Sequence, residues 1–129
     1  MKSAAAAKGD EFPCEERTCN LSAALDRLDG DHGLLTMLIT IFQEDSLTLF
    51  DELQAATERR HLADAMRNAH SLKGLAANFD AFPAVNAALV VEGAARQGDW
   101  QLITGGLPDL KLKLEQLRSA LAEYQRSAG

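Results

Sequence analysis

The sequence predicts an all-α protein, an antiparallel up-and-down four-helix bundle with a short N-terminal lid helix. Composition is one reason: 47% of the 129 residues are hydrophobic and only 5% are aromatic, which favours helices packed through small and aliphatic side chains over a sheet. The other reason is that apolar residues recur at helical spacing over four long stretches separated by short turns. A chain of this length can form a single core without disulfides or metal.

The bundle is expected to occupy residues 20–125, between an N-terminal tail or linker at 1–19 and a C-terminal tail at 126–129. Residues 1–19 show no sustained period. Cys14 and Cys19 lie in this segment without CxxC spacing or a nearby histidine, so we expect unpaired thiols. The chain has no uninterrupted apolar run of about 18 residues and no signal-like segment. We therefore expect a cytoplasmic protein without direct membrane contact.

Two helices are predicted in the first half of the chain. Asn20 is a suitable N-cap for a short first helix that ends near Gly30. Asp31 can cap a long amphipathic second helix over about residues 32–58, with its acidic residues largely off the apolar stripe. That stripe consists of Leu34, Leu35, Leu38, Ile41, Phe42, Leu49, Leu53 and Ala56.

Two more helices follow. The third covers about residues 61–79, and its inward positions are Leu62, Ala65, Ala69, Leu72, Ala76 and Phe79. Pro83 suits the start of a fourth helix that reaches about Gln97, and one face of this helix holds Val85, Ala88, Leu89 and Glu92. Because a buried carboxylate is costly unless it is hydrogen-bonded, Glu92 should find a donor or lie at the rim of the core.

The last helix contains a proline. Gly98 and Asp99 mark a helix end and a new N-cap, and the inward positions that follow are Ile103, Leu107, Leu110, Leu114, Leu117 and Leu121. Proline removes one hydrogen bond from a helix and clashes with the preceding turn. With Gly105 and Gly106 just before it, Pro108 predicts a kink, or a break into two pieces, near residues 104–108.

The third helix carries a histidine on its polar side. At about 100° per residue, the apolar positions Ala65, Leu72, Leu75 and Phe79 lie about 140–220° from His70, so its ring should point away from the core. Small and cationic residues share its face, namely Ala63, Met66, Arg67, Lys73, Gly74 and Ala77. Glycine inside a helix costs roughly 0.5–1 kcal/mol relative to alanine, so Gly74 calls for a reason, such as close approach by a partner.

Charge is distributed unevenly along the chain. The formal net charge is −6, which argues against general nucleic-acid binding. The stretch 59–79 nevertheless has a local charge of +3, from Arg59, Arg60, Arg67 and Lys73 against Asp64. Such a patch suits an anionic group or an acidic partner; the alternative is an ordinary solvated helix face.

The stretch His70-Ser71-Leu72-Lys73-Gly74, followed by Leu75-Ala76-Ala77-Asn78, resembles the signature of histidine-containing phosphotransfer (HPt) domains, the relay modules of multistep two-component signalling. The resemblance extends over about residues 21–121. It includes Phe42-Gln43-Glu44-Asp45 and an acid, Glu92, placed 22 residues after the histidine. Two departures are Asp80, where the family usually has glycine, and the interruption of the last helix at Pro108.

The resemblance implies roles for individual residues. His70 is then the phosphoacceptor, Lys73 stabilises charge, Gly74 provides access, and Glu92 hydrogen-bonds the imidazole. The residues expected to bind the partner are Arg67, Ser71, Ala77 and Asn78.

The function implied by the resemblance is that of a phosphorelay intermediate rather than an enzyme. The group would come from a receiver-domain aspartyl phosphate and pass reversibly to another receiver domain. The partners would be response-regulator receiver domains, a hybrid sensor histidine kinase, or both, which would supply the Mg²⁺ and most of the catalysis. The resemblance implies a monomer with no cofactor and no metal of its own, and no nucleic-acid partner.

Two alternatives remain open at this stage. The same face could dock receiver domains without carrying phosphate. A metal- or haem-binding four-helix carrier would need several inward ligands, and the sequence has neither an E-x-x-H pair nor C-x-x-C-H. His32 and His61 lack a second ligand at i+3 or i+4, so we interpret them as surface residues.

Overall fold

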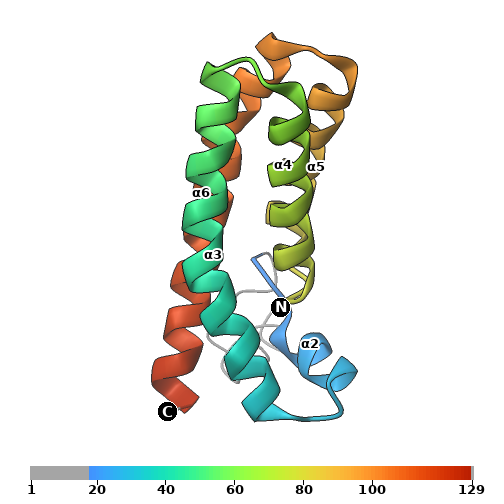
Figure 1. The fold of residues 1–129 in the computed structure, drawn as a ribbon. Helices are drawn as coiled ribbons and strands as arrows, with labels where there is room; N and C mark the ends of the chain where they lie inside the picture. The colour runs from blue at the N-terminus through green and yellow to red at the C-terminus, as the bar shows by residue number, and fades with distance from the viewer. Residues whose placement is uncertain (1–17, 129) are drawn as a thin grey trace, which may run out of the picture.

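A computed structural model describes residues 18–128, and these form five helices (Figure 1). They are α2 (Leu21–Arg27), α3 (His32–Glu58), α4 (Leu62–Ala77), α5 (Phe82–Gln97) and α6 (Trp100–Ala128). The predicted all-α bundle is confirmed, with each of the first four helices within three residues of its expected bounds. The last helix runs on through residues 126–128, which the sequence suggested as a tail.

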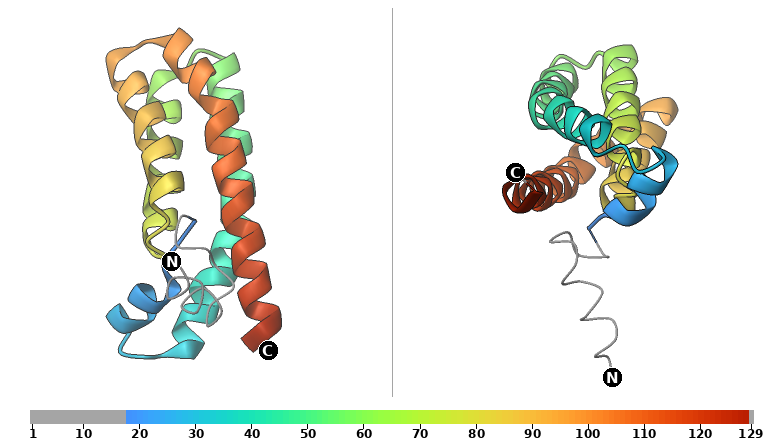
Figure 2. Two further views of the ribbon diagram at one scale, coloured as in Figure 1. Left: turned by 180° about the vertical axis from the view of Figure 1, so that it is seen from behind. Right: turned by 90° about the horizontal axis from the view of Figure 1, so that it is seen from below.

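The four long helices run in alternating directions along the chain (Figure 1). α3 packs against α4 and α6, and α5 packs against the same two helices, as both views in Figure 2 also indicate. Residues from all four helices fill the space between them: Leu35, Ile39, Phe42, Leu53, Leu72, Phe79, Val91, Ile103, Leu110, Leu114, Leu117 and Leu121. The Phe42 and Phe79 rings meet edge to face at a centroid distance of 5.7 Å, so they join the middle of α3 to the end of α4.

Some predicted core positions are wrong. Residues 34, 41, 62 and 89 are apolar and were expected inside, yet they are 37–47% exposed: Leu34, Ile41, Leu62 and Leu89. On α3 the positions buried instead are Ile39, Ser46, Phe50 and Thr57. The reason is that α3 has neighbours on two sides, α4 and α6, and their placement rotates the buried face away from the centre of the apolar stripe.

By length and composition alone, α3 could cross a membrane, since an 18-residue window reaches a mean hydropathy of 1.2. In the bundle, however, Leu35, Ile39, Phe42 and Leu53 of this helix are completely buried among protein side chains. A core helix passes the same test of length and composition, so we interpret α3 as one of the core helices of the bundle.

α6 continues through its proline, so of the kink or break predicted near residues 104–108 the break is wrong, and the kink stays a prediction. The structure also explains why one of the two glycines before Pro108 is a glycine. A Cβ atom at Gly106 would lie 3.1 Å from Cγ2 of Val91, whereas one at Gly105 would meet nothing within 4 Å. Gly106 therefore marks a close approach of α6 to α5 rather than the end of a helix.

α2 covers the end of the bundle at which α4 turns into α5 (Figure 1). The Asn20 amide donates to the carbonyl of Phe79 at 2.8 Å, and Arg27 forms an ion pair with Asp80 at 2.7 Å. Asp80 has φ +51°, the left-handed conformation that glycine adopts easily and aspartate tolerates better than most residues. Asp80, which stands where the family usually has glycine, therefore keeps the backbone conformation of the turn, and its ion pair with Arg27 stabilises that turn.

Cys19 is buried and disulfide-bonded, so the prediction of an unpaired thiol is wrong for this residue. The spacing criteria we applied test for metal sites and redox motifs, and a disulfide requires neither. Cys14 and the rest of the predicted tail up to residue 17 lie outside the described residues.

Candidate functional site

His70 lies near the middle of α4 on the outside of the bundle. Its side chain is 65% exposed, while Ala65, Leu72 and Phe79 on the opposite side of the helix are fully buried. The orientation expected from the 100° period is therefore confirmed. α2 sits at the end of the bundle and leaves the ring open to solvent.

Glu92 of α5 receives three donors around one carboxylate. Nδ1 of His70 lies 2.9 Å from Oε2, Nζ of Lys73 lies 2.8 Å from Oε1, and Nη2 of Arg96 lies 3.2 Å from Oε2. The Glu92 side chain is only 4% exposed. These donors satisfy the requirement that a carboxylate removed from water be hydrogen-bonded.

The hydrogen bond from Lys73 lowers the pKa of the Glu92 carboxyl below its ordinary value. Burial acts in the opposite direction, because it disfavours the charged form, and the hydrogen bond with His70 again lowers the pKa. The net direction is downward, so at neutral pH Glu92 is an anion. An ionised carboxylate accepts hydrogen bonds only, which makes Nδ1 of His70 the donor.

This hydrogen bond determines the chemistry that the imidazole offers. A neutral ring with its proton on Nδ1 carries an unprotonated lone pair on Nε2. Because the ring is exposed, Nε2 is available to an incoming electrophile. The arrangement can therefore present a histidine nucleophile with a fixed tautomer, backed by a buried anion.

The surface next to His70 is small. Gly74 is exposed, and a Cβ atom there would meet nothing within 4 Å, so no contact within the chain requires glycine. Ala77 is also exposed, whereas Ser71 and Asn78 are half-buried. Asn78 ends α4, and its carbonyl accepts a hydrogen bond from Arg27, a contact with the lid rather than with the histidine.

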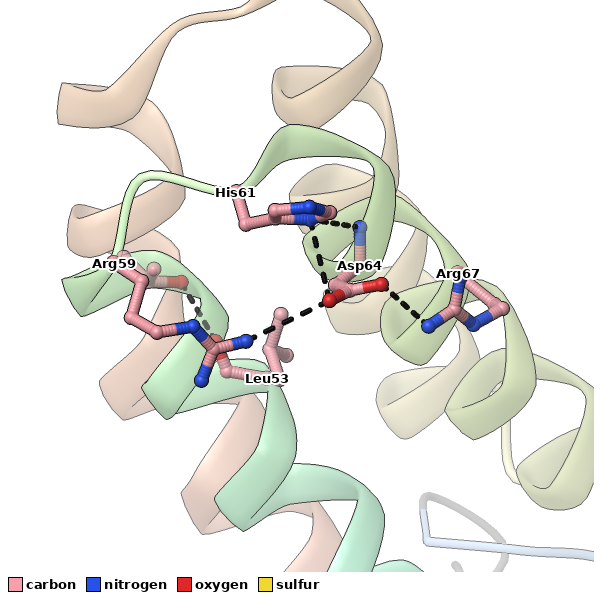
Figure 3. Close-up of polar contacts among 6 residues, drawn as sticks. Leu53, Arg59, His61, Asp64 and Arg67 are labelled. Atoms are coloured by element: carbon pink, nitrogen blue, oxygen red, sulfur yellow. Dashed lines mark hydrogen bonds and ion pairs between the residues drawn. The ribbon is translucent and has the colours of Figure 1, made fainter.

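Arg67 is directed away from His70, toward the start of α4. Figure 3 shows the Asp64 carboxylate paired with Arg59 and Arg67 at the turn between α3 and α4, with Nδ1 of His61 lying 3.2 Å from it. His61 also caps the helix, since its Nδ1 accepts from the Asp64 amide at 3.3 Å. The cations of the predicted basic patch are thus dispersed: Arg59 and Arg67 lie around Asp64, and Lys73 lies at Glu92. Arg60 stacks over the ring of Trp100, 5.3 Å from its centroid.

Sequence reasoning missed Arg96. It lies four residues after Glu92 on α5, a spacing at which opposite charges meet on a helix surface. That signal was present in the sequence. The Arg96–Glu92 contact matters for the site because Glu92 also contacts α4, and only the packing of α4 on α5 reveals this.

The other two histidines belong to different surroundings. His32 contacts the Tyr124 hydroxyl at 3.2 Å, and His61 lies in the Asp64 cluster. Among residues 18–128, no group of three or more His, Cys, Asp or Glu side chains is arranged to hold a metal ion.

Comparison with known protein families identifies the family to which most of the chain is similar. A family model described as Hpt domain matches residues 37–120, more than half of the chain. Neither the curated proteins nor the solved structures contain a significant match. The matched range includes His70, Lys73, Gly74, Glu92 and Arg96.

Proposed function

The chain belongs to the Hpt domain family, and from this premise we propose that His70 is its phosphoacceptor and that the protein is a phosphorelay intermediate. Hpt domains are phosphocarrier modules of two-component signalling and interact with receiver domains and kinases. The observation that supports the assignment is the 2.9 Å hydrogen bond from Nδ1 of His70 to Glu92, made by a side chain that is 65% exposed. This combination offers Nε2 as an accessible nucleophile.

In the proposed reaction, Nε2 of His70 attacks the phosphorus of a receiver's aspartyl phosphate. The N–P bond forms as the P–O bond to the aspartyl oxygen breaks, and the aspartate leaves as a carboxylate with that electron pair. The ring becomes an imidazolium that keeps its proton on Nδ1, facing the Glu92 carboxylate. Transfer to another receiver domain is the reverse of this step, so the module carries the group in either direction.

Lys73 and the small residues would serve the incoming partner. The Lys73 ammonium lies one helical turn after the histidine and offsets the negative charge of the phosphoryl group. Gly74 and Ala77 leave space for the receiver's loops beside the ring. Arg67, Ser71 and Asn78 border this face and are proposed as partner contacts.

The partner would supply most of the catalysis. Phosphoryl transfer depends on in-line positioning and neutralisation of charge, and a receiver domain would bring its aspartate and Mg²⁺. The partners are response-regulator receiver domains, a hybrid sensor histidine kinase, or both. We place this activity in the cytoplasm, in a monomer that needs neither a cofactor of its own nor contact with nucleic acid or membrane.

A second function, receiver docking without phosphate transfer, uses the same face of α4. The hydrogen-bonded arrangement of His70 and Lys73 on Glu92 favours chemistry over docking alone, since docking requires no fixed tautomer. The two functions differ in one product, a phosphate on the protein that is labile in acid and stable in alkali.

The test is phosphoryl transfer from a ³²P-labelled receiver domain to three forms of the full chain. The wild type and His32→Gln should become labelled, because His32 lies at the start of α3 in contact with Tyr124, away from the Glu92 cluster. His70→Gln should fold normally, since this side chain lies outside the core, and should remain unlabelled. Labelling of His70→Gln would refute the assignment, and a wild type that binds the receiver without being labelled would support docking alone.

A further inference from the structure

The two oxygens of the Glu92 carboxylate have different partners. Oε1 accepts from Lys73 alone, at 2.8 Å, whereas Oε2 accepts from both His70, at 2.9 Å, and Arg96, at 3.2 Å. Lys73 can therefore leave without breaking either hydrogen bond at the oxygen that orients the ring. If Arg96 left instead, Oε2, the oxygen that accepts from the ring, would lose one of its two hydrogen bonds.

The proposed reaction makes the departure of Lys73 costly. If its ammonium turns to the phosphoryl group, the carboxylate loses one of its two fixed cations while its side chain is 4% exposed. If the imidazolium of His70 were its only cationic partner, the buried carboxylate would be destabilised, or would take the proton from Nδ1 and stop accepting from that nitrogen. After that departure, Arg96 is the fixed cation that remains within hydrogen-bond distance of Glu92.

We propose that Arg96 is a positioning residue, which holds the Glu92 carboxylate ionised and aligned with Nδ1 of His70 while Lys73 turns to the phosphoryl group. This inference depends on the proposed function of His70. The two cations then have separate tasks: Lys73 exchanges between Glu92 and the phosphoryl group, and Arg96 stays on Glu92 throughout.

The exposure of Arg96 separates this role from a structural one. Its side chain is 63% exposed, although its partner Glu92 is only 4% exposed. An ion pair made by so exposed a cation contributes little to folding as long as Lys73 still holds the carboxylate. Removal of its charge should therefore leave the midpoint of unfolding unchanged. Arg126 on α6 is a control for the loss of an exposed arginine charge, because it is 69% exposed and pairs at i,i+3 with Glu123, which is itself 55% exposed.

The experiment compares Arg96→Gln, Arg96→Lys and Arg126→Gln with the wild type, all as the full chain. Long-range ¹H–¹⁵N spectra of the imidazole report which ring nitrogen carries the proton. In the free protein, Arg96→Gln should keep the proton on Nδ1, because Lys73 still holds Glu92. The double variant Lys73→Gln/Arg96→Gln should lose this preference, which shows that the measurement responds to the network.

Phosphorylation should reveal the difference. After loading with phosphoramidate, a small-molecule phosphodonor, Arg96→Gln should lose the downfield Nδ1 proton signal of the hydrogen bond to Glu92, while the wild type and Arg126→Gln retain it. Transfer to a receiver domain should be slower by about five-fold in Arg96→Gln. Arg96→Lys should restore most of the rate, since it returns a cation to Oε2.

The outcomes distinguish the two proposals. A wild type that phosphoramidate and receiver domains both fail to phosphorylate on His70 overturns the proposed function and this inference with it. A wild type that is phosphorylated normally, with Arg96→Gln transferring at the same rate as Arg126→Gln, overturns only the role of Arg96. The same conclusion follows if Arg96→Gln has already lost the Nδ1 proton in the free protein, because Arg96 would then act in the resting site rather than during exchange.

Discussion

Nδ1 of His70 and Oε2 of Glu92 lie 2.9 Å apart, although 22 residues separate them in the sequence. The hydrogen bond joins the exposed face of α4 to an acid at the rim of the core on α5. Since Glu92 is held in place by the helix packing and by two further cations, the ring of an exposed histidine acquires a defined orientation and tautomer.

The first prediction concerns the charge of Glu92. Glu92→Gln keeps the shape of the side chain but cannot balance the imidazolium that forms on transfer, and its amide can accept through one oxygen only. We expect transfer from a receiver domain to slow by about ten-fold, a loss of roughly 1.4 kcal/mol of transition-state stabilisation. Single-turnover labelling measures this rate.

Glu123→Gln is the control for that experiment, because Glu123 is an exposed acid in a surface ion pair on α6. It should transfer at the wild-type rate. Equal rates for Glu92→Gln and Glu123→Gln would mean that the carboxylate does not assist the reaction.

The second prediction is a pH dependence of stability. The pKa of Glu92 is lowered in the folded protein, chiefly by the hydrogen bond from Lys73, so the folded state binds fewer protons than the unfolded state. Its contribution to the free energy of unfolding is therefore fully present above about pH 5 and is lost as the pH falls through the folded-state pKa. The difference in free energy of unfolding between His70→Gln and His70→Gln/Glu92→Gln should therefore shrink as the pH falls below about 5.

Urea unfolding at pH 7, 5, 4 and 3 checks this prediction, and the His70→Gln background removes any contribution from titration of the histidine. The difference between the two proteins isolates Glu92, because the other carboxyl groups are common to both. A difference that stays constant down to pH 3 would show that Glu92 is not held as an anion by folding.

Much of the fold was predictable because the helices carry strong local signals. Asn20 and Asp31 cap their helices, each with its side chain accepting from a backbone amide at 3.0 Å, and Gly98 ends α5 with φ +73°. These features depend on neighbouring residues alone. The misplaced core positions, such as Ile41, depend instead on where α4 and α6 lie against α3, which a single-helix period does not contain.

The site divides in the same way. The outward orientation of His70 and the nearness of Lys73 follow from helical geometry within α4. The three-way hydrogen bonding of Glu92 needs the register between α4 and α5, and so the role that we propose for Arg96 could not be inferred from its spacing alone. The continuity of α6 past Pro108 was missed because the proline, with two glycines just before it, favoured an interruption of the helix. The structure instead uses Gly106 for close packing against Val91.

The third prediction separates stability from function at Gly74. A Cβ atom fits there without contact, so Gly74→Ala should raise the free energy of unfolding by about 0.5–1 kcal/mol, the usual gain for alanine over glycine inside a helix. If the space above Gly74 serves the receiver, the same variant should transfer phosphate more slowly. Chemical unfolding and labelling rates, measured together, reveal the opposed effects.

Gly105→Ala is the matched control for Gly74, because its Cβ atom also meets nothing within 4 Å and it lies on α6. It should gain similar stability and transfer at the wild-type rate. Unchanged transfer in Gly74→Ala as well would remove the argument that Gly74 is there for access.

The last prediction uses the same control to test how closely α6 packs on α5. In Gly106→Ala the new methyl group would lie 3.1 Å from Cγ2 of Val91, a fully buried side chain with little room to move. The propensity gain of alanine is then offset by overpacking, which costs typically 1–3 kcal/mol in a well-packed core. We expect Gly106→Ala to be less stable than the wild type and Gly105→Ala to be more stable, as measured by urea unfolding. If Gly106→Ala gained as much stability as Gly105→Ala, α5 and α6 would have moved apart without loss of stability. The close approach would then not explain why glycine stands at position 106.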